Sequence, residues 1–522
     1  NAGGGGAAGG ANGGGGGTAG GGGSTAGGGG STSTDMDGTT GDDMTATAGG
    51  PYDWLQFGGS PQHASANTLE TTLTAANVGT LKQLFQTTVP SYVDGAPVVA
   101  HGVTVKGATH DAVFVTTRPG DIVALDGHSG TILWQQAHGN ASCKINNGAS
   151  VCYTTSSPAI DPGRQYVYSY GLDGYVHKHA IADGTEVTTG GWPELVSTKT
   201  FDEKSASPLA FATAKSGNTY LYVAAGGYPG DHGDYQGHLT TIDLGSGAQN
   251  VFNTLCSDQT VHFVTTPGTP DCSNVQSAIW ARAGAGIYEP TLDRLFIATG
   301  NGNYAPAMGA WADSLMAVNP DGTGNAGPLD SYTPATFASL QTGDLDLGST
   351  APLILPAITN STVAHIGLQG GKDALLRLLD LSNLSGQSKT GQTGGELAQI
   401  AIPQGGQMLT APALWIDGTG TPWIFVATKS GTSAVTVTAD ATGKLAINTK
   451  WKNTNARNSP LVANGVLYLA GSNVVEALDP TTGTSLFSDK TIGALHWQSP
   501  VVANGVLYVA DSSAHVTAWS LP

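Results

Sequence analysis

Two stretches near the C-terminus decide the fold: SPLVANGVLYLAGSNVVEALDPTTGTSLF at residues 459–487 and SPVVANGVLYVADSSAHVTAWS at residues 499–520. Each opens with an apolar run, passes through an Asn-Gly pair and continues as a second apolar run. Asn-Gly between such runs is the strongest short-range signal of a β-hairpin. A third strand follows, and in the first copy an Asp-x-x-x-Gly turn leads to a fourth. The unit is therefore predicted to be a small antiparallel sheet.

Looser copies of the same unit fill the chain before these two. A repeat of this kind predicts an architecture built from similar supersecondary units, and units of four strands predict the blades of a propeller. The earlier copies lie at residues 95–134, 157–179, 207–246, 285–324, 351–386 and 411–445. With the two C-terminal copies they give an all-β fold, an eight-bladed β-propeller over residues 51–522.

The last copy ends at Leu521-Pro522 without its fourth strand. The segment LKQLFQTTVP, residues 81–90, precedes the first full copy and has no partner of its own. A propeller ring avoids exposed sheet edges when such a surplus strand completes the last blade. We therefore predict that residues 81–90 close the ring.

Residues 1–50 are a low-complexity stretch of Gly, Ala, Ser and Thr that ends in an Asp-containing segment. Such a sequence cannot bury enough apolar surface to offset its ordering entropy, and it predicts a flexible tail or linker. Two roles stay open for it: a plain spacer, or a segment for self-assembly that docks on a neighbouring subunit.

The composition excludes several classes of partner. Of 522 residues 77 are glycine, only 11% are charged, and the formal net charge is −18. Nucleic acid and anionic membrane surfaces require clustered Lys and Arg, so neither is an expected partner. We also expect no membrane span, because no apolar run reaches the roughly 18 residues that a spanning helix requires.

The four cysteines form two close pairs, Cys143 with Cys152 and Cys256 with Cys272. Two local disulfides are the simplest interpretation, and buried thiols are the alternative. Disulfides favour a secreted, periplasmic or cell-surface protein, with Asn1 following a cleavage site. No CxxCH motif occurs, so we expect no haem.

The sequence IVALDGHSGTILW at residues 122–134 resembles the repeat of the pyrroloquinoline-quinone (PQQ) propeller family, and the resemblance extends over nearly all of residues 52–522. It implies that the tryptophan of the repeat docks neighbouring blades. Many relatives with this repeat bind no cofactor, so the repeat by itself indicates the fold.

Three further segments resemble quinoprotein alcohol dehydrogenases and polyvinyl-alcohol-dehydrogenase-like members. SAIWARAGAGIYEPTLDRLFIATGNGNYAP at residues 277–306 resembles the segment that supplies a tryptophan floor and a calcium-binding asparagine, here Trp280 and Asn301. DLDLGSTAPLILP at residues 344–356 is similar to the segment with the catalytic aspartate, here Asp346 with Asp344 as second choice. GLQGGKDALLRLLD at residues 367–380 corresponds to the strand whose basic residue contacts the quinone carbonyls, here Lys372.

The run GDYQGHLTTIDLGSG, which begins at Gly233, resembles the stretch that completes the calcium site, and it points to Asp234. Carboxylate and amide oxygens are the ligands that calcium prefers, and the ion would polarise a quinone carbonyl. The resemblance thus implies PQQ and Ca²⁺ as cofactors. Lys372 would stabilise a developing oxyanion, an aspartate would take the alcohol proton, and Trp280 would offer a stacking surface.

Each of these residues also has a purely structural interpretation. Asn301 suits a left-handed turn and Trp280 a blade-docking core position. The aspartates Asp234, Asp344 and Asp346 would cap turns through local hydrogen bonds, and Lys372 after Gly-Gly would be a solvated hairpin residue. His177 and His179 lie in one predicted strand, and we expect one of them to face outward and no metal to bind there.

Three functions remain open at this point. The first is a calcium-dependent quinoprotein dehydrogenase that oxidises a small-molecule or polymer alcohol, with a separate electron acceptor. The second is a non-catalytic surface, matrix or filament-forming propeller whose Gly-rich tail tethers it or docks into a neighbour. The third is a carbohydrate- or peptide-binding module.

Overall fold

The computed structural model describes residues 50–146, 150–259, 272 and 274–522. The predicted tail, residues 1–50, therefore lies outside the described residues except for its last one, and its role in self-assembly stays a prediction. Among the described residues no helix is long and apolar enough to cross a membrane.

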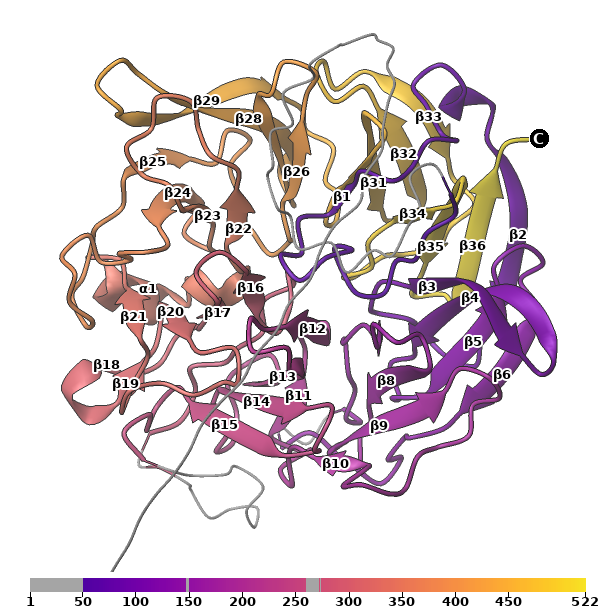
Figure 1. Cartoon of the computed structure of the whole chain (residues 1–522), viewed down its shortest axis with the longest axis horizontal. Coiled ribbons are helices and arrows are strands. Elements are labelled where there is room, and N and C mark those ends of the chain that lie inside the picture. The colour runs from indigo at the N-terminus through magenta and orange to yellow at the C-terminus, as the bar shows by residue number, and fades with distance from the viewer. Residues whose placement is uncertain (1–49, 147–149, 260–271, 273) are drawn as a thin grey trace, which may run out of the picture. The chain divides into compact units, whose positions relative to one another are not determined.

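The described chain forms eight small antiparallel sheets arranged in a ring, and the predicted eight-bladed β-propeller is confirmed (Figure 1). The first four blades contain these strands: β3 (Val98–Val105), β4 (Ala108–Thr116), β5 (Ile122–Asp126) and β6 (Ile132–Gln136) in blade 1; β7 (Ala159–Ile160), β8 (Tyr166–Tyr170), β9 (Tyr175–Ala180) and β10 (Glu194–Leu195) in blade 2; β11 (Glu203–Ser205), β12 (Ala210–Thr213), β13 (Thr219–Gly227), β14 (His238–Asp243) and β15 (Gln249–Asn253) in blade 3; β16 (Ile287–Glu289), β17 (Arg294–Ala298), β20 (Leu315–Val318) and β21 (Asp330–Tyr332) in blade 4.

The remaining four blades follow in chain order and return to the start of the ring. Their strands are β22 (Leu353–Leu355), β23 (Ile366–Gln369), β24 (Leu375–Asp380) and β25 (Ala398–Ala401) in blade 5; β26 (Ala413–Ile416), β27 (Pro422–Thr428), β28 (Gly431–Ala439) and β29 (Leu445–Lys452) in blade 6; β30 (Leu461–Ala463), β31 (Val466–Gly471), β32 (Val474–Leu478) and β33 (Ser485–Asp489) in blade 7; β34 (Val501–Ala503), β35 (Val506–Ala510), β36 (His515–Ser520) and β2 (Lys82–Thr88) in blade 8.

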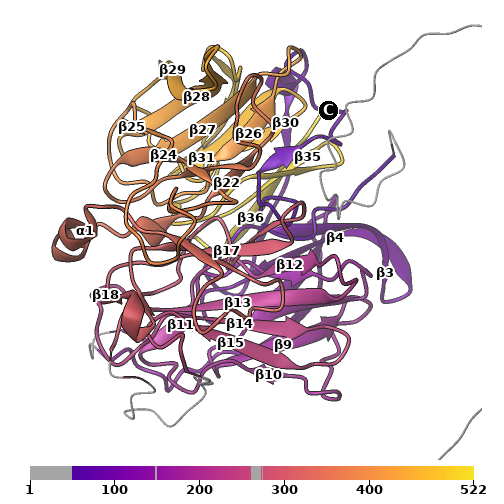
Figure 2. The same cartoon turned by 60° about the vertical axis from the view of Figure 1, so that its left-hand side comes forward.

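A few short elements lie outside this pattern. They are β1 (Ala66–Asn67), which pairs with β30; the ribbon of β18 (Tyr304–Ala305) and β19 (Ala310–Trp311); the helix α1 (Phe337–Gly343); and the 3-10 turns η1 (Val78–Thr80), η2 (Pro306–Met308) and η3 (Leu347–Ser349). In the turned view of Figure 2, α1 and β18 stand at the rim, away from the inner strands.

The ring closes as the sequence predicted. β2, from the N-terminal side of the first blade, pairs antiparallel with β36 and is the outer strand of blade 8. In Figure 1 the indigo β2 lies beside the yellow β36. This pairing removes the open edge that β36 would otherwise present.

Turn chemistry explains why the repeat forms hairpins. In blade 7 Asn464 and Gly465 both have positive φ, 47° and 68°, as a two-residue type I′ turn requires. After the third strand, Asp479 Oδ1 accepts hydrogen bonds from the backbone N–H groups of Thr481 and Thr482, at 2.8 and 3.0 Å. The short polar side chain thereby fixes the turn that leads to the fourth strand.

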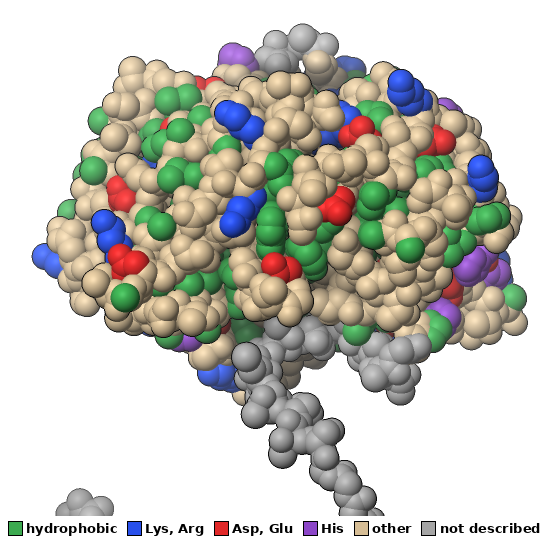
Figure 3. Space-filling view, turned by 90° about the horizontal axis from the view of Figure 1, so that it is seen from above, with side chains coloured by type: hydrophobic (Ala, Val, Ile, Leu, Met, Phe, Trp, Pro, Cys, Tyr) green, Lys and Arg blue, Asp and Glu red, His purple; other side chains and the backbone are tan. Residues whose placement is uncertain are grey.

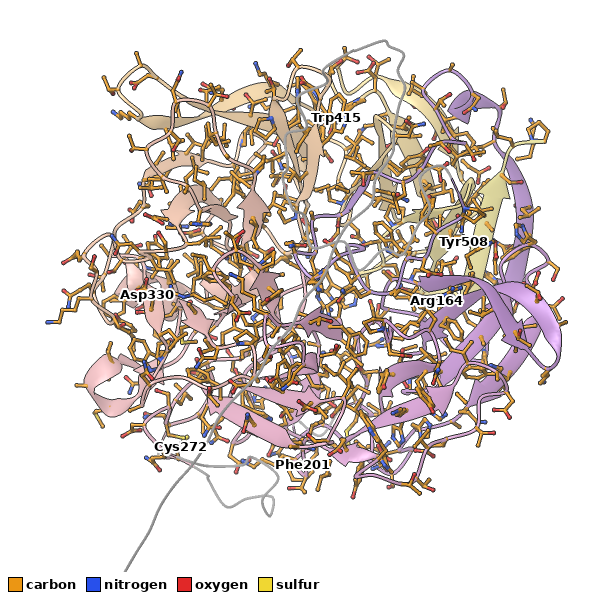
Figure 4. All side chains as sticks on the ribbon, viewed as in Figure 1. Arg164, Phe201, Cys272, Asp330, Trp415 and Tyr508 are labelled. Atoms are coloured by element: carbon orange, nitrogen blue, oxygen red, sulfur yellow. A yellow bond between two sulfur atoms is a disulfide. The ribbon has the colours of Figure 1, made fainter. Side chains whose placement is uncertain are left out.

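Tryptophans of the repeat dock neighbouring blades, as the resemblance implied. Trp134 of blade 1 donates from Nε1 to the carbonyl of Ile181 in blade 2, at 3.0 Å. A Cβ on Gly184 would approach the Trp134 ring to 2.7 Å, so a glycine is required beneath it. Figure 4 shows side chains filling the spaces between the sheets, and it places Tyr508 of blade 8 beside blade 1, where its hydroxyl donates to the Gly127 carbonyl.

The segment 52–67, which we call the N-terminal strap, connects the inner strands of most blades. Its backbone or side chains hydrogen-bond to residues of blades 1, 2, 3, 4, 6, 7 and 8. The partners are Val99, Ile160, Phe211, Tyr288, Leu414, Val462 and Val502. The inner strand of each blade is a sheet edge that faces the ring axis. The strap hydrogen-bonds to backbone groups of these edges that would otherwise have no partner in the protein.

The space-filling view agrees with the low charge content of the chain. In Figure 3 the Lys, Arg, Asp and Glu side chains stand mostly singly among uncharged atoms.

Candidate functional site

Turns from neighbouring blades meet at one end of the ring. Trp280 precedes the inner strand β16, and Asp346 precedes the inner strand β22. Trp280 stands as many residues before Gly286 as Asp346 stands before Pro352. Asn301 follows β17 and Lys372 follows β23. Since each second strand runs antiparallel to its inner strand, its end lies where the inner strand begins. The four predicted side chains are therefore brought to the same end of blades 4 and 5.

Asp346 is the centre of this group. One carboxylate oxygen accepts a hydrogen bond from the backbone N–H of Asn301 at 2.6 Å, and the other lies 2.5 Å from Lys372 Nζ. Burial raises the pKa of Asp346 above its ordinary value, although Lys372 opposes the shift. The result is a buried carboxylate that is oriented on both oxygens and more basic than a surface aspartate.

Lys372 connects three of the predicted residues. Its ammonium contacts Asp346 and also Asp344 Oδ1 at 2.8 Å, and it lies 5.2 Å from the ring centroid of Trp280. Burial would lower the pKa of Lys372, but the two carboxylates raise it overall. The Asp344 side chain is 67% exposed, so it reaches the Lys372 ammonium from the surface, whereas the Asp346 side chain is buried.

Trp280 is partly exposed, with its indole Nε1 near Gly300. A Cβ on Gly300 would meet Asp346 Oδ1 at 2.6 Å and Trp280 Nε1 at 3.1 Å. The glycine therefore permits the tryptophan and the carboxylate to approach each other. A partly exposed indole face beside an ammonium suits the stacking of a planar ligand that carries negative charge.

Asn301 joins a carboxylate that the sequence analysis did not select. Its side-chain Nδ2 donates to Asp231 Oδ2 at 3.1 Å, and the Tyr235 hydroxyl donates to the other oxygen of Asp231 at 2.6 Å. Burial raises the pKa of Tyr235, so it remains a neutral donor. Asp231 lies three positions before the predicted Asp234, in the same turn.

Asp234 lies against a second carboxylate, Asp202. The pKa of Asp202 is raised to about 6 by burial and by its hydrogen bond with Asp234. Lys199 Nζ stands 3.8 Å from Asp234 Oδ2, and Asn146 Nδ2 donates to Asp202 at 2.7 Å. Two carboxylates that share a proton mark a place where a divalent cation is favoured.

A register argument identifies Asp202 from the sequence. Pro208, Gly286 and Pro352 precede the inner strands of blades 3, 4 and 5. The same number of residues separates each of them from Asp202, Trp280 and Asp346, respectively. Aligning the repeats on these positions would have selected Asp202. Asp231 has no such signal, because its turn differs in length from the corresponding turns.

Asp231 and Asn301 offer oxygen atoms of the kinds that calcium binds, and they contact each other. Asp234 lies instead against Asp202. Carboxylates and an amide oxygen are the ligand types that Ca²⁺ takes, at flexible coordination number. The carboxylate that contacts the Asn301 side chain is therefore Asp231 and not the predicted Asp234. Calcium binding by Asp234 and Asn301 stays a prediction.

Basic side chains also gather near the start of blades 3 and 4 and the end of β4 in blade 1. The buried Lys204 is surrounded by the charges of Arg282, Arg118 and Asp94. Burial, reinforced by Arg282, lowers the pKa of Lys204 to about 7, and burial lowers the pKa of Arg282 to about 9. Arg118 and Arg282 together carry more positive charge than Asp94 carries negative charge, and this excess favours an anionic ligand.

Aromatic rings line this basic group. Arg118 lies 4.0 Å from the ring centroid of Tyr153, Lys204 lies 4.5 Å from the same centroid, and Arg282 lies 4.1 Å from that of Trp497. The rings stabilise the cations without neutralising them. The positive charge therefore remains available to a ligand.

The pKa of Asp313, close to Asp346, gives a prediction for stability. Burial, followed by the charges of Asp346 and Asp373, raises the Asp313 pKa to about 7, against 3.8 in the unfolded chain. The fold therefore holds a proton that the unfolded chain releases, and the free energy of unfolding falls as the pH rises from 4 to 7. The rise of the pKa from 3.8 to about 7 corresponds to a loss of about 4 kcal/mol of unfolding free energy between pH 4 and pH 8, and we expect Asp313→Asn to remove this loss.

Urea unfolding of both proteins at pH 4 and pH 8 measures this difference. Asparagine tolerates the positive φ of 49° at this position. Asp258 is exposed, and Asp258→Asn serves as the control. This variant should show the same change of unfolding free energy with pH as the wild type. An equal loss between pH 4 and pH 8 in wild type and Asp313→Asn would contradict the assignment.

One predicted disulfide is present. Cys143 and Cys152 are bonded, with a Cα–Cα distance of 5.5 Å. Cys256 and Cys272 are both buried and belong to one hydrophobic cluster with Leu255 and Ala310. A bond between Cys256 and Cys272 stays a prediction.

The fold and the site together define a propeller of the PQQ type. The sequence matches the family described as "outer membrane protein assembly factor BamB", a PQQ-repeat family, over residues 56–188, 86–301 and 389–521. These matches extend over more than half of the chain, so the chain belongs to the PQQ-type β-propeller family. A comparison with curated protein sequences finds no match.

Solved structures share the fold at low identity. The quinohemoprotein alcohol dehydrogenase ADHIIG from Pseudomonas putida HK5 superposes with a TM-score of 0.62 at 13% identity, covering 90% of this chain and 80% of that one. The quinohemoprotein alcohol dehydrogenase from Comamonas testosteroni gives 0.62 at 14%, with the same coverages. A europium-containing methanol dehydrogenase gives 0.62 at 13%, covering 90% of this chain and 98% of that one. At these identities the likeness shows the fold.

Proposed function

We propose that this protein is a calcium-dependent quinoprotein dehydrogenase that oxidises an alcohol or a polyol-like polymer. The observation that carries the proposal is the position of Asp346. It is buried, held between the Asn301 N–H and the Lys372 ammonium, and adjacent to the partly exposed Trp280. Three residues from separate parts of the chain thus meet around the Asp346 carboxylate, and all four stand in the chain order that the resemblance predicts.

The residues present fit PQQ, a planar quinone that carries carboxylate groups. Trp280 would stack on its plane, and Lys372 would contact a carbonyl oxygen. The basic group of Arg118, Lys204 and Arg282 supplies counter-charge for carboxylates. Calcium would be held by Asp231 and Asn301, with Asp234 as the further ligand that the resemblance implies. When bound, the quinone accepts a hydride from the alcohol carbon, and the cation polarises its carbonyl.

The chain itself would handle the proton of the alcohol. Asp346 is the acceptor, because its raised pKa makes it a stronger base than an exposed carboxylate, while Lys372 keeps it ionised. The Asn301 N–H orients one oxygen and the Lys372 ammonium contacts the other, so the substrate would meet a carboxylate that is fixed on both oxygens. The electrons then leave to a separate acceptor.

The Cys143–Cys152 disulfide supports a location outside the cytoplasm, since disulfides persist in oxidising compartments. A secreted, periplasmic or cell-surface location is part of the proposal. The tail of residues 1–50 would then serve as a spacer or an attachment segment.

Binding of PQQ in the presence of calcium is the test. We expect a saturable absorbance change and a rise in melting temperature, because a ligand at about 100 times its Kd stabilises by about 2.7 kcal/mol. Lys372→Ala and Asn301→Ala should each abolish the shift, and removal of calcium with a chelator should do the same.

Lys429→Ala is the matched control. Lys429 occupies the turn between the second and third strands of blade 6, as Lys372 does in blade 5, but it is exposed. This variant should bind PQQ like the wild type. Absence of binding to the wild type at saturating PQQ and calcium would reject the proposal and favour a non-catalytic surface, matrix or filament-forming propeller.

A further inference from the structure

Three histidines and two carboxylates gather between blades 1 and 2, whereas Trp280, Asn301, Asp346 and Lys372 belong to blades 4 and 5. We call His138, Asp173, His177, His179 and Glu186 the histidine cluster. His138 follows β6, Asp173 lies in the β8–β9 turn, and the other two histidines belong to β9. The expectation that one of the two faces outward is wrong: both are buried, because residues two apart in a strand share a face.

His177 is held in the manner of a metal ligand. Its Nδ1 lies 2.6 Å from Glu186 Oε1, and its Nε2 lies 3.1 Å from Asp173 Oδ1. In protein metal sites the ring nitrogen that does not bind the ion commonly donates to a carboxylate, which fixes the ring. Glu186 fills that role here, and Nε2 is directed toward Asp173.

His138 and His179 form a hydrogen-bonded pair with an assignable tautomer. His179 Nδ1 lies 3.1 Å from the Gly184 carbonyl, so this nitrogen carries the hydrogen. His179 Nε2 is then the acceptor for His138 Nε2–H, at 2.9 Å. His138 Nδ1 consequently carries a lone pair.

Deprotonated imidazole is the form that binds metal ions, and the tautomer of the His138–His179 pair leaves a lone pair on His138 Nδ1 for an ion.

We propose that His138, His177 and Asp173 bind a divalent transition-metal ion of the Zn²⁺ class. One ligand atom from each of the three lies within 4.8 Å of the others, and the rings of His138 and His177 are 3.4 Å apart between centroids. Zinc ligands at about 2.0–2.2 Å from the ion stand roughly 3.3 Å from one another. Binding would therefore draw the ligand atoms together and tilt the stacked rings of His138 and His177, so that their in-plane lone pairs converge on the ion. Imidazole with carboxylate selects such ions rather than calcium.

The geometry gives the ion a structural consequence. His138 belongs to the connection after the outer strand of blade 1, whereas Asp173 and His177 belong to blade 2. A bound ion would therefore link the two blades. Asp173, on the exposed side of the cluster, gives the ion access from solvent.

Zinc titration of tag-free, chelator-stripped protein, without PQQ, tests the proposal by calorimetry and thermal melting. We expect one equivalent to bind, a rise in melting temperature, and weaker binding below pH 6 as protons compete. Asp173→Asn and His177→Gln should each weaken binding by at least tenfold, and Glu186→Gln by about 10–100-fold. Cobalt in place of zinc should give the visible spectrum of a low-symmetry site.

A second group of histidines on blade 1 supplies the matched control. His101 and His128 both contact Asp111, at 2.6 and 3.1 Å. The double variant His101→Ala/His128→Ala should bind zinc like the wild type. Zinc binding that is lost in this double variant but kept in Asp173→Asn, or no saturable binding by the wild type, would overturn the proposal. Because Asp173 is exposed, Asp173→Asn is expected to fold, and the result does not depend on quinone binding.

Discussion

Replacing Asp346 with asparagine is expected to lower alcohol turnover by about 10²–10⁴-fold, the usual contribution of a general base. Asparagine keeps the shape of the side chain and an oxygen for the Asn301 N–H, but it cannot accept the proton of the substrate. Its amide also meets the Lys372 ammonium, a donor against a donor. Dye-linked oxidation of a short primary alcohol and of poly(vinyl alcohol), with PQQ and calcium supplied, measures the loss.

Asp344→Asn is the control for this variant. Asp344 contacts the same ammonium, at 2.8 Å, but its exposed position makes the pair weak. We expect its turnover to stay within a few-fold of the wild type. PQQ affinity measured on both variants separates a loss of chemistry from a loss of cofactor. Wild-type turnover by Asp346→Asn would show that another group takes the proton.

Replacing Trp54 with alanine is expected to lower the free energy of unfolding by about 3–5 kcal/mol. Trp54 is 1% exposed and lies in the N-terminal strap, where its backbone N and O both bond to Val99 at 2.8 Å. Its indole packs on Gly59, where a Cβ would approach to 2.6 Å. Removing the indole would leave a cavity at the point where the strap enters the ring, and urea unfolding would report the loss.

Trp423→Ala serves as the comparison. Trp423 is a partly exposed tryptophan of β27, with its Nε1 donating to Asp417 at 2.9 Å. Its removal should cost about 1 kcal/mol, the value of one hydrogen bond with limited packing. Equal losses for the two variants would mean that the strap does not stabilise the ring more than a surface tryptophan does.

Much of the fold was predictable because each blade is encoded locally. The Asn-Gly pairs, the Asp-x-x-x-Gly turns and the alternating apolar residues fix four strands within a short stretch of chain. Repetition then makes each weak signal stronger. The surplus strand at residues 81–90 and the missing strand after Pro522 predicted the closure, since a sheet edge must be covered.

The site was predictable only in part. Trp280, Asn301, Asp346 and Lys372 come together as expected, because each stands at the same end of a blade. Asp231 was missed, because its position depends on how one irregular turn folds across to a neighbouring blade. The roles of all these residues in catalysis and binding stay predictions.

The sequence by itself thus determined the eight blades, their closure and the segments that meet at one end of the ring. Only the tertiary structure decided the course of the N-terminal strap and the pairing of Asp202 with Asp234. It alone also decided the meeting of His138 with His177. The physical reason is the separation along the chain. Turns and strands are determined by neighbouring residues, whereas these contacts join residues far apart in the sequence and depend on how neighbouring blades pack.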